Sequence, residues 1–300
     1  MKIIALDLGG TFIKAALMNE NAEILESWKV PSPTDSFEKF EEALDKCVKP
    51  HLQGADGIAM SMPGRIDINK GIAHTAGAFS NIISEFEMGK YLEERYGLPA
   101  AVDNDGKCAA NAENWIGALK DVSSGLVYVI GTGIGGGIVI DNKVHRGINF
   151  SAGELSCCLI DLKQGCSFTN WTAMSMATPS LLKQYTAAIQ TDEKIDGIEF
   201  FKRVNDKDPM AREVLRQFAK LTAAYFYNLQ TVLDIDTIAI GGGISAQPVL
   251  LEFIKEECDI IWQGKYGMML PCKEPNIVLC QYGNDANLIG AVKNFLDLKK

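Results

Sequence analysis

Two stretches of the chain share one pattern of apolar runs and glycine-rich turns. Residues 3–17 read IIALDLGGTFIKAAL, which predicts an apolar strand, a Gly-Gly-Thr turn and a second strand with alternating apolar positions. Residues 126–140 read LVYVIGTGIGGGIVI and predict the same strand–turn–strand unit, followed by an Asp141-Asn142 turn. Because the two units lie about 120 residues apart, the pattern predicts a chain of two related halves.

Helical and strand patterns alternate through the rest of the chain. Apolar runs at 57–62, 100–102 and 237–240 predict buried strands. Helical spacing predicts helices over 37–48, 88–96, 108–119 and 246–257, and a long amphipathic helix from Val214 to Val232. This alternation favours an α/β protein with two lobes and a cleft between them, divided near residues 118–124.

Composition and charge exclude several classes of protein. The chain has 300 residues, 47% hydrophobic and 22% charged, which suits two globular domains and neither a disordered chain nor a fibre. Its net charge of -9 leaves no basic surplus for binding phosphate backbones, so neither nucleic acid nor an anionic membrane is an expected partner.

The N-terminal residues and the cysteines predict a cytoplasmic location. Asp7 interrupts the first apolar run before a signal-peptide core could form, and no window approaches the length of a membrane span. Eight cysteines without a C-x-x-C pair are typical of reduced thiols.

Three glycine-rich turns, each after an apolar strand, are candidate phosphate-binding sites. They lie at residues 9–10, 131–137 and 241–243, where backbone N–H groups are not covered by side chains. One such turn could serve only a tight hairpin, but three favour a nucleotide. The second turn is not a dinucleotide-binding motif, because Gly137 leads into a strand instead of a helix, and no P-loop sequence is present.

The ordered set of motifs resembles the ROK family of sugar kinases. It extends over nearly the whole chain and consists of Asp7-Leu8-Gly9-Gly10-Thr11 with Lys14, Met62-Pro63-Gly64, Asn104-Asp105, Gly131–Gly137, Gly153-Glu154-Leu155, Ile240-Gly241-Gly242-Gly243 and residues 284–291.

The resemblance implies a fold and an activity. The fold would be the two-lobed actin-like ATPase (ribonuclease H-like) fold, an α/β fold with its active site in the cleft between the lobes. An N-terminal lobe would span 1–118 and carry the sugar and phosphate side, joined by a C-terminal helix at 286–300. A C-terminal lobe at 119–285 would carry the nucleotide side. The activity would be transfer of phosphate from ATP, with Mg²⁺, to a primary 6-hydroxyl of a hexose or β-glucoside, by a homodimer.

The resemblance also assigns roles to residues. The two phosphate turns would contain Gly9, Gly10, Thr11, Gly131, Thr132 and Gly133, with Lys14 nearby, and Gly242 and Gly243 would border adenosine. Asp7 would hold magnesium through water. Asp105 would be the general base. The sugar would be bound by Gly64, Asn81, Asn104, Asp105 and Glu154.

Chemistry supports Asp105 independently of the resemblance. Transfer to a hydroxyl needs one carboxylate near the attacking oxygen, and residues 103–105 lie between a strand and a helix, where α/β enzymes expose functional groups. Capping of the helix is the alternative role, and we assign it to Asp103. Glu154 could instead be a solvated loop residue.

One motif departs from the family. Many members hold a structural zinc with a histidine after the Gly-Glu pair and a later cysteine-rich stretch. Here Cys157 stands in place of the histidine and the later stretch keeps only Cys166, so we expect no structural zinc and ordinary thiols at Cys157, Cys158 and Cys166. The change leaves room near the anomeric end of the sugar, as in the zinc-less members that resemble β-glucoside kinases.

Other functions stay open at this point. Within the same family, a glucokinase or an N-acetylmannosamine kinase is the nearest alternative, and a catalytically inactive sugar sensor is another. A DNA-binding repressor is disfavoured, because the first strand begins at Ile3 without a preceding helix-turn-helix and the chain is acidic.

Overall fold

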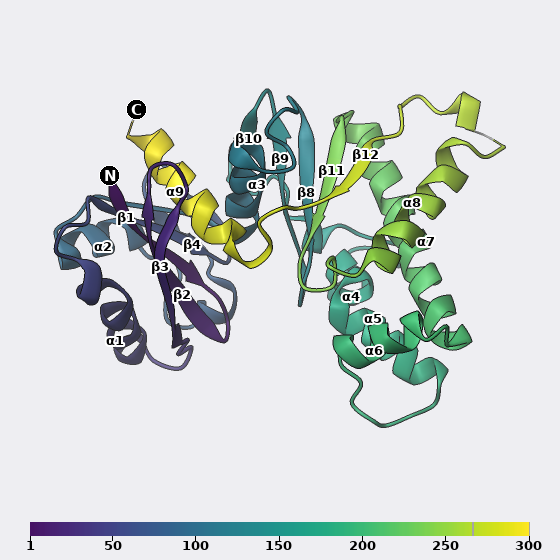
Figure 1. The fold of residues 1–300 in the computed structure, drawn as a ribbon, viewed down its shortest axis with the longest axis horizontal. Helices are drawn as coiled ribbons and strands as arrows, with labels where there is room; N and C mark the ends of the chain where they lie inside the picture. Colours follow the sequence, from purple (N-terminus) through teal and green to yellow (C-terminus); the bar gives the residue numbers. More distant parts are fainter. Residues whose placement is uncertain (266, 300) are drawn as a thin grey trace. The chain divides into compact units, whose positions relative to one another are not determined.

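Strands and helices alternate along the chain in a computed structural model, which describes residues 1–265 and 267–299 (Figure 1). The strands are β1 (Lys2–Leu8), β2 (Phe12–Asn19), β3 (Ile24–Pro31), β4 (Gly57–Met62), β5 (Ile66–Asp67), β6 (Ile72–Ala73), β7 (Ala100–Asn104), β8 (Gly125–Ile130), β9 (Ile134–Ile140), β10 (Lys143–His145), β11 (Thr237–Gly241) and β12 (Asn276–Leu279). The helices are α1 (Phe37–Val48), α2 (Met88–Tyr96), α3 (Asp105–Ile116), α4 (Thr172–Met176), α5 (Thr178–Ala188), α6 (Gly197–Asn205), α7 (Pro209–Leu233), α8 (Pro248–Trp262) and α9 (Ala286–Leu298).

The two large sheets have the same topology. The first has the strand order β3-β2-β1-β4-β7 and the second the order β10-β9-β8-β11-β12. In the first, three antiparallel strands (β3, β2 and β1) are followed by β4 and β7, which are added in parallel, and β11 and β12 are likewise parallel additions in the second. The duplication predicted from the two glycine-turned hairpins is therefore confirmed, as is the α/β class.

Helix boundaries differ from the predicted ones where capping residues decide them. Helix α3 begins at Asp105 instead of 108, because the Asn104 side chain accepts a hydrogen bond from the Lys107 N–H and caps the helix. Helix α7 begins at Pro209 behind the capping residue Asp208. The helical spacing alone did not reveal these starts, since caps lie outside the apolar pattern.

The chain divides into two compact units. The first unit comprises residues 1–120, 137–153 and 284–300, and the second comprises 121–136 and 154–283. Residues 137–153 thus join the first unit, whereas we expected all of 119–285 in one lobe. The reason is that β10 packs against α3. Among the described residues, no helix has the length and apolar character needed to cross a membrane.

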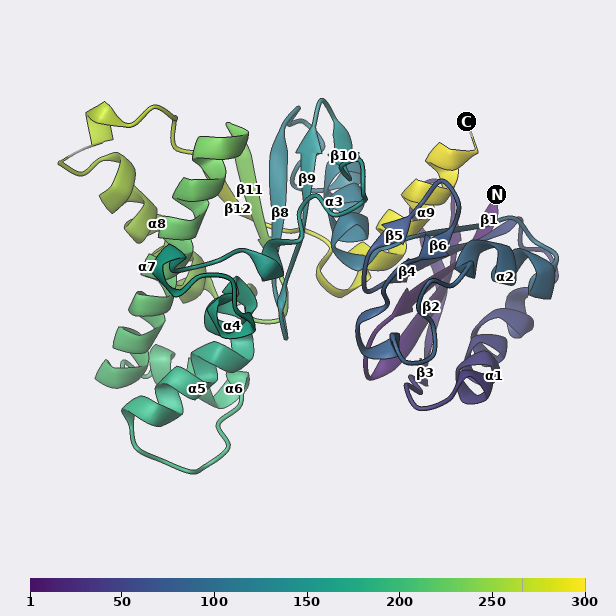
Figure 2. The ribbon, with the colours of Figure 1, turned by 180° about the vertical axis from the view of Figure 1, so that it is seen from behind.

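Helices cover both faces of the first sheet. Helices α1 and α2 lie on one side of β1 and β4, and α9 lies on the other (Figures 1 and 2). Ile4 and Leu6 of β1 pack in one buried cluster with Phe40 of α1 and Leu92 of α2. On the opposite face, a Cβ at Gly57 would lie 2.1 Å from the Phe295 ring of α9, so glycine is required there for the helix to approach.

Helix α9 also packs closely against α3. A Cβ at Gly290 would lie 1.7 Å from the carbonyl oxygen of Cys108, so the two helix backbones meet at this glycine. Since α3 begins at Asp105 and α9 follows Asp285, this contact joins the two segments that carry much of the candidate chemistry of the first unit.

In the second unit, the long helix α7 packs against its sheet. The ring of Phe226 meets the ring of Tyr128 of β8 edge-on, with 5.0 Å between centroids, and both side chains are buried. Helices α5, α6 and α8 pack against α7 in turn.

We predict that Gly290→Ala destabilises the protein by about 1–3 kcal/mol or more, because the added methyl group overlaps the Cys108 carbonyl and α3 and α9 must separate. Thermal or denaturant unfolding measures the change. Gly197→Ala is the matched control: it lies in the first turn of α6, where the new Cβ would be 3.9 Å from its nearest neighbour, and should be neutral or slightly stabilising. Equal stability of the two variants would contradict the close contact.

Candidate active site

Asp7 lies near the end of β1 and is held by three side chains. In the sheet it is paired with Lys14 of β2 and with Ser61 of β4. Its Oδ1 accepts hydrogen bonds from Ser61 Oγ at 3.2 Å and from Asn287 Nδ2 at 3.0 Å, and Lys14 Nζ lies 3.4 Å from Oδ2. Because Asp7 is only 4% exposed, these contacts fix the orientation of its carboxylate.

Asp105 follows β7 directly as the first residue of α3. Its Oδ1 accepts hydrogen bonds from Asn104 Nδ2 and from the Gly106 N–H, each at 2.8 Å. The same Asn104 amide also donates to the Gly64 carbonyl oxygen at 2.9 Å. Asn104 thus joins the strand end, the helix start and the Gly64 turn, and it holds Asp105 in one orientation.

The Gly64 turn requires glycine for steric reasons. Gly64 has a φ of +101°, and a Cβ there would lie 2.1 Å from the Thr75 carbonyl oxygen. Asn81 lies farther along the same connection, after the short helical turn at Gly77–Phe79, and is exposed.

Asp103 does not cap α3, and our interpretation of it as a cap was wrong. Its carboxylate is 1% exposed and pairs with Arg146, whose Nη2 lies 2.5 Å from Oδ2. Burial acts to lower the pKa of Arg146, but the charge and hydrogen bond of Asp103 outweigh it, so the pKa is raised. The buried Asp103 carboxylate is therefore neutralised by the half-buried guanidinium of Arg146, while Asn104 supplies the cap.

The first glycine turn exposes bare backbone. The Gly9 N–H donates within the turn to the carbonyl oxygens of Asp7 and Phe12, at 3.1 and 3.2 Å. A Cβ at Gly9 would lie 2.9 Å from the Phe12 carbonyl oxygen, whereas a Cβ at Gly10 would have no atom within 4 Å. Packing explains the glycine at position 9. At position 10 nothing in the free chain requires glycine, which suits close approach of a ligand.

The second unit carries the other two glycine turns. Within the first of them, the Gly131 N–H donates to the Gly133 carbonyl oxygen at 3.0 Å, and Thr132 between them is exposed. Gly242 has a φ of +97° and a Cβ there would lie 2.1 Å from the Ile130 carbonyl oxygen, but a Cβ at Gly243 would have no neighbour within 4 Å. Position 243 therefore resembles position 10, because at both positions no contact within the protein requires glycine.

A cavity of about 300 Å³ adjoins Gly243. It is lined by Gly243, Ile244 and Gln247 after β11 and by the first residues of α6, Asp196–Ile198, with Phe201. Ile198 is 82% exposed, although Ile244 and Phe201 are buried. An exposed apolar side chain beside bare backbone suits a flat, partly apolar group such as a nucleobase.

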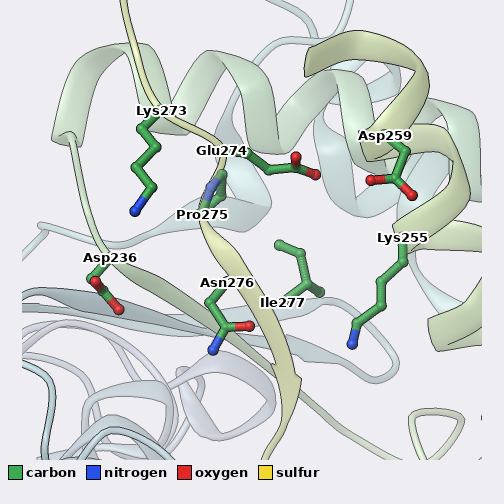
Figure 3. Close-up of a pocket in the computed structure, with 8 residues that line it drawn as sticks. All are labelled: Asp236, Lys255, Asp259, Lys273, Glu274, Pro275, Asn276 and Ile277. Atoms are coloured by element: carbon green, nitrogen blue, oxygen red, sulfur yellow. The ribbon is translucent and has the colours of Figure 1, made fainter. Parts of the chain in front are cut away.

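A second cavity in this unit lies away from the glycine turns. Its residues, drawn in Figure 3, include Asp236 directly before β11 and Asn276 at the start of β12. They therefore mark the amino ends of these parallel strands, whereas Gly241–Gly243 mark the carboxyl end of β11. Since ligands of open α/β sheets bind at the carboxyl ends, we do not include this cavity in the candidate site.

Glu154 and the three cysteines of the departing motif lie in the second unit. Glu154 directly precedes the short helical turn Leu155–Cys157 and is half-buried. Cys157 and Cys166 are exposed and Cys158 is half-buried, and burial raises the pKa of the Cys157 thiol.

The residues near Asp7 would suit a magnesium ion that is held mainly by water and phosphate oxygens and only in part by the protein. Among the described residues, no group of three or more histidine, cysteine or acidic side chains could hold a metal ion. Asp7 offers a single carboxylate whose Oδ1 already accepts two hydrogen bonds. It therefore fits a cation that keeps water and phosphate oxygens as most of its shell.

Three residues of this region were not predicted as site residues. Ser61 lies in an apolar strand, and its polar position in that run was the available signal. Asn287 lies in the C-terminal run 284–291 that carries part of the resemblance. Arg146 had no sequence signal, because its pairing with Asp103 joins positions far apart in the chain.

Comparison with known proteins gives matches over the full length. The ROK family pattern matches residues 3–297. A β-glucoside kinase from Klebsiella pneumoniae is 31% identical over 300 residues, which cover 99% of this chain and 97% of that protein. A ROK hexokinase from Thermus thermophilus is 28% identical with a TM-score of 0.82, covering 100% of this chain and 99% of that chain. A ROK family protein from Streptococcus pneumoniae, solved in complex with sucrose, is 27% identical with a TM-score of 0.88 and the same coverage.

These matches confirm the expectation drawn from the motifs. The duplicated sheets with their helices are the actin-like ATPase fold of the ROK sugar kinases. Because the family pattern spans nearly the whole chain, this protein belongs to the ROK family.

Proposed function

We propose that this protein is an ATP-dependent carbohydrate kinase that phosphorylates the 6-hydroxyl of a β-glucoside, with Asp105 as its general base. One observation carries the proposal: the Asp105 carboxylate stands at the junction of β7 and α3, oriented by Asn104 Nδ2 and the Gly106 N–H at 2.8 Å each. A base must be held within hydrogen-bonding reach of the proton it removes, and these two donors fix it in place.

In this proposal Asn104 acts mainly on Asp105 and less on the sugar. Its two amide N–H groups have partners in Gly64 and Asp105, and its Oδ1 accepts from the Lys107 N–H. Asn104 could contact a sugar hydroxyl directly only through the remaining lone pair of its Oδ1. Asp105, the Gly64 turn, Asn81 and Glu154 would then provide most of the contacts to the sugar.

The glycine turns would bind the phosphates of ATP through backbone N–H groups, and the cavity beside Gly243 would take the adenine. Gly9, Gly10 and Thr11 would act from the first unit with Lys14, and Gly131, Thr132, Gly133 and Gly242 from the second. Magnesium, when bound with ATP, neutralises charge on the transferring phosphoryl group, and Asp7 would hold it through water.

The β-glucoside is favoured over free glucose by two observations. Cys157, instead of the family's histidine, follows the Gly-Glu pair, and by the family resemblance the loss of that histidine would leave space near the anomeric carbon. The β-glucoside kinase of Klebsiella pneumoniae is 31% identical to this chain over its full length. A glucokinase or an N-acetylmannosamine kinase is the alternative within the same mechanism, and an inactive sugar sensor would release no ADP. The homodimer stays a prediction that light scattering can test, and the cytoplasmic location stays a separate prediction.

We predict that Asp105→Asn lowers kcat by about 10²–10⁴-fold and changes the sugar KM far less. The asparagine Oδ1 can still accept the hydrogen bonds from Asn104 and Gly106, so the junction is preserved while the base is lost. A coupled ADP-release assay measures both parameters.

The control for this variant is Asp121→Asn, an exposed aspartate, which should keep wild-type kcat. Asp103→Asn is unsuitable as a control, because it would leave the half-buried Arg146 without its carboxylate partner. If Asp105→Asn kept more than about a tenth of kcat, Asp105 would not be the base.

Gly10→Ala should raise the KM for ATP by about tenfold or more without loss of thermal stability. The new Cβ meets no atom of the protein within 4 Å, so its effect would come from contact with the nucleotide alone. Calorimetric titration with a non-hydrolysable ATP analogue measures the affinity, and the sugar KM is the internal control. Unchanged nucleotide affinity would remove this turn from the site.

Cellobiose should be phosphorylated with a kcat/KM at least equal to that of glucose, because the vacated anomeric end accepts a second sugar. The measurement is a panel that also contains N-acetylglucosamine and N-acetylmannosamine, since specificity is a ratio of kcat/KM values. Strong preference for free glucose or an N-acetyl sugar would contradict the β-glucoside proposal and leave the kinase intact.

A further inference from the structure

A cavity of about 650 Å³ in the first unit lies outside the candidate active site. Its walls come from α3, from the β9–β10 turn with β10, and from α9; α3 packs against both β10 and α9 (Figures 1 and 2). Its volume is within the range of small-molecule sites. Its residues are Asn111, Asn114, Trp115, Lys120, Asn142, Lys143, Val144, Arg146, Lys293 and Asp297.

The cavity is separate from the reacting groups. Asp105 begins α3, whereas the residues of α3 that line the cavity start at Asn111 and continue to Trp115. At a rise of about 1.5 Å per residue, Asn111 lies about 9 Å and Trp115 about 15 Å along the helix from Asp105. A ligand in the cavity would therefore not occupy the place of the sugar hydroxyl beside Asp105.

The cavity is strongly basic although the chain is acidic. Four cationic side chains and one carboxylate line it, in a protein of net charge -9. Lys293 pairs with Asp297 at 2.5 Å and Arg146 with the buried Asp103. Lys120 and Lys143 have no ion-pair partner in the part of the chain that the structure describes. These two lysines supply positive charge that no protein carboxylate neutralises, which suits an anion.

Two buried polar atoms in the same wall have no hydrogen-bond partner among residues 1–265 and 267–299. Asn111 is 6% exposed, and its buried Nδ2 makes no hydrogen bond with the described residues. The buried Oδ1 of Asn114 likewise has none, while its Nδ2 donates to the Asn142 carbonyl oxygen at 2.9 Å. An unsatisfied buried donor and acceptor are costly, and one hydroxyl group can satisfy both kinds of atom.

We propose that this cavity is a binding site for a sugar phosphate. The phosphate would meet Lys120 and Lys143 at the open side, the hydroxyl groups would meet Asn111 and Asn114, and Trp115 would offer an aromatic face to the sugar ring. The ligand class is that of the product of the proposed kinase, but binding in this cavity does not depend on that activity.

The test is calorimetric titration of the full-length protein with glucose 6-phosphate, with the active site filled by an excess of glucose and a non-hydrolysable ATP analogue. We expect binding that weakens at least about tenfold in the Lys120→Glu/Lys143→Glu double variant. The charge-matched control is the double variant Lys194→Glu/Lys220→Glu, at two exposed lysines outside the cavity, which should bind like the wild type. Kinase turnover is not part of the readout, so failure of this site and failure of the proposed activity are distinguishable.

Asn111→Leu separates a ligand site from a structural role. Leucine is close in shape and removes the unsatisfied Nδ2, so the thermal midpoint of the free protein should rise while affinity for glucose 6-phosphate falls. A drop in thermal midpoint with unchanged affinity would assign Asn111 to packing and overturn its role here.

Three outcomes overturn the proposal. The wild type could show no binding of glucose 6-phosphate, or the double variant could bind it as tightly as the wild type. Inorganic phosphate could also bind as tightly as glucose 6-phosphate and be lost equally in the double variant, which would make the cavity a bare anion site and exclude recognition of the sugar.

Discussion

The amide of Asn104 is the contact on which the candidate chemistry of the first unit depends. This side chain caps α3, hydrogen-bonds the Gly64 turn at the end of β7 and orients the Asp105 carboxylate. Two of these bonds satisfy backbone groups, one at the helix start and one in the strained Gly64 turn, and the third orients the Asp105 carboxylate. Position and orientation of the proposed base therefore follow from the need to complete the hydrogen bonds of one strand–helix junction.

The negative charge of Asp103, next to this strand–helix junction, is balanced by Arg146, which is distant in sequence. Asp103 is almost fully buried, and burial of a carboxylate is costly unless the charge is paired and hydrogen-bonded. Arg146 supplies the partner from the segment after β10, which is one reason why residues 137–153 belong to the first unit. Arg146 also lines the basic cavity, so the proposed sugar phosphate site and the junction that carries Asp105 share one guanidinium.

Duplication explains why similar turns recur in both units. Each sheet opens with a hairpin whose glycines lie at strand ends, and each continues with strands added in the same order. The reason for glycine differs from one position of these turns to the next. Gly9 and Gly242 avoid overlap with carbonyl oxygens of their own unit, whereas Gly10 and Gly243 face open space. The second pair is where a ligand explains the residue better than packing does.

The sequence by itself determined the α/β class, the duplicated hairpins, most of the helices and strands, and the family. These follow from local spacing: apolar periodicity, glycine at strand ends, and short motifs read in order. Asp7, Gly10 and Asp105 could be proposed as site residues from the sequence because their motifs are contiguous.

Only the tertiary structure decided the start of α3 and the true partners of Asp103 and Asp7. It also decided the cavity formed by α3, β10 and α9. Arg146 and Asp103 are 43 positions apart, and Asn287 and Asp7 are 280 apart, so no local pattern could join them. The physical reason is that buried polar groups must be paired, and the fold, through its packing, chooses which distant side chain supplies the partner.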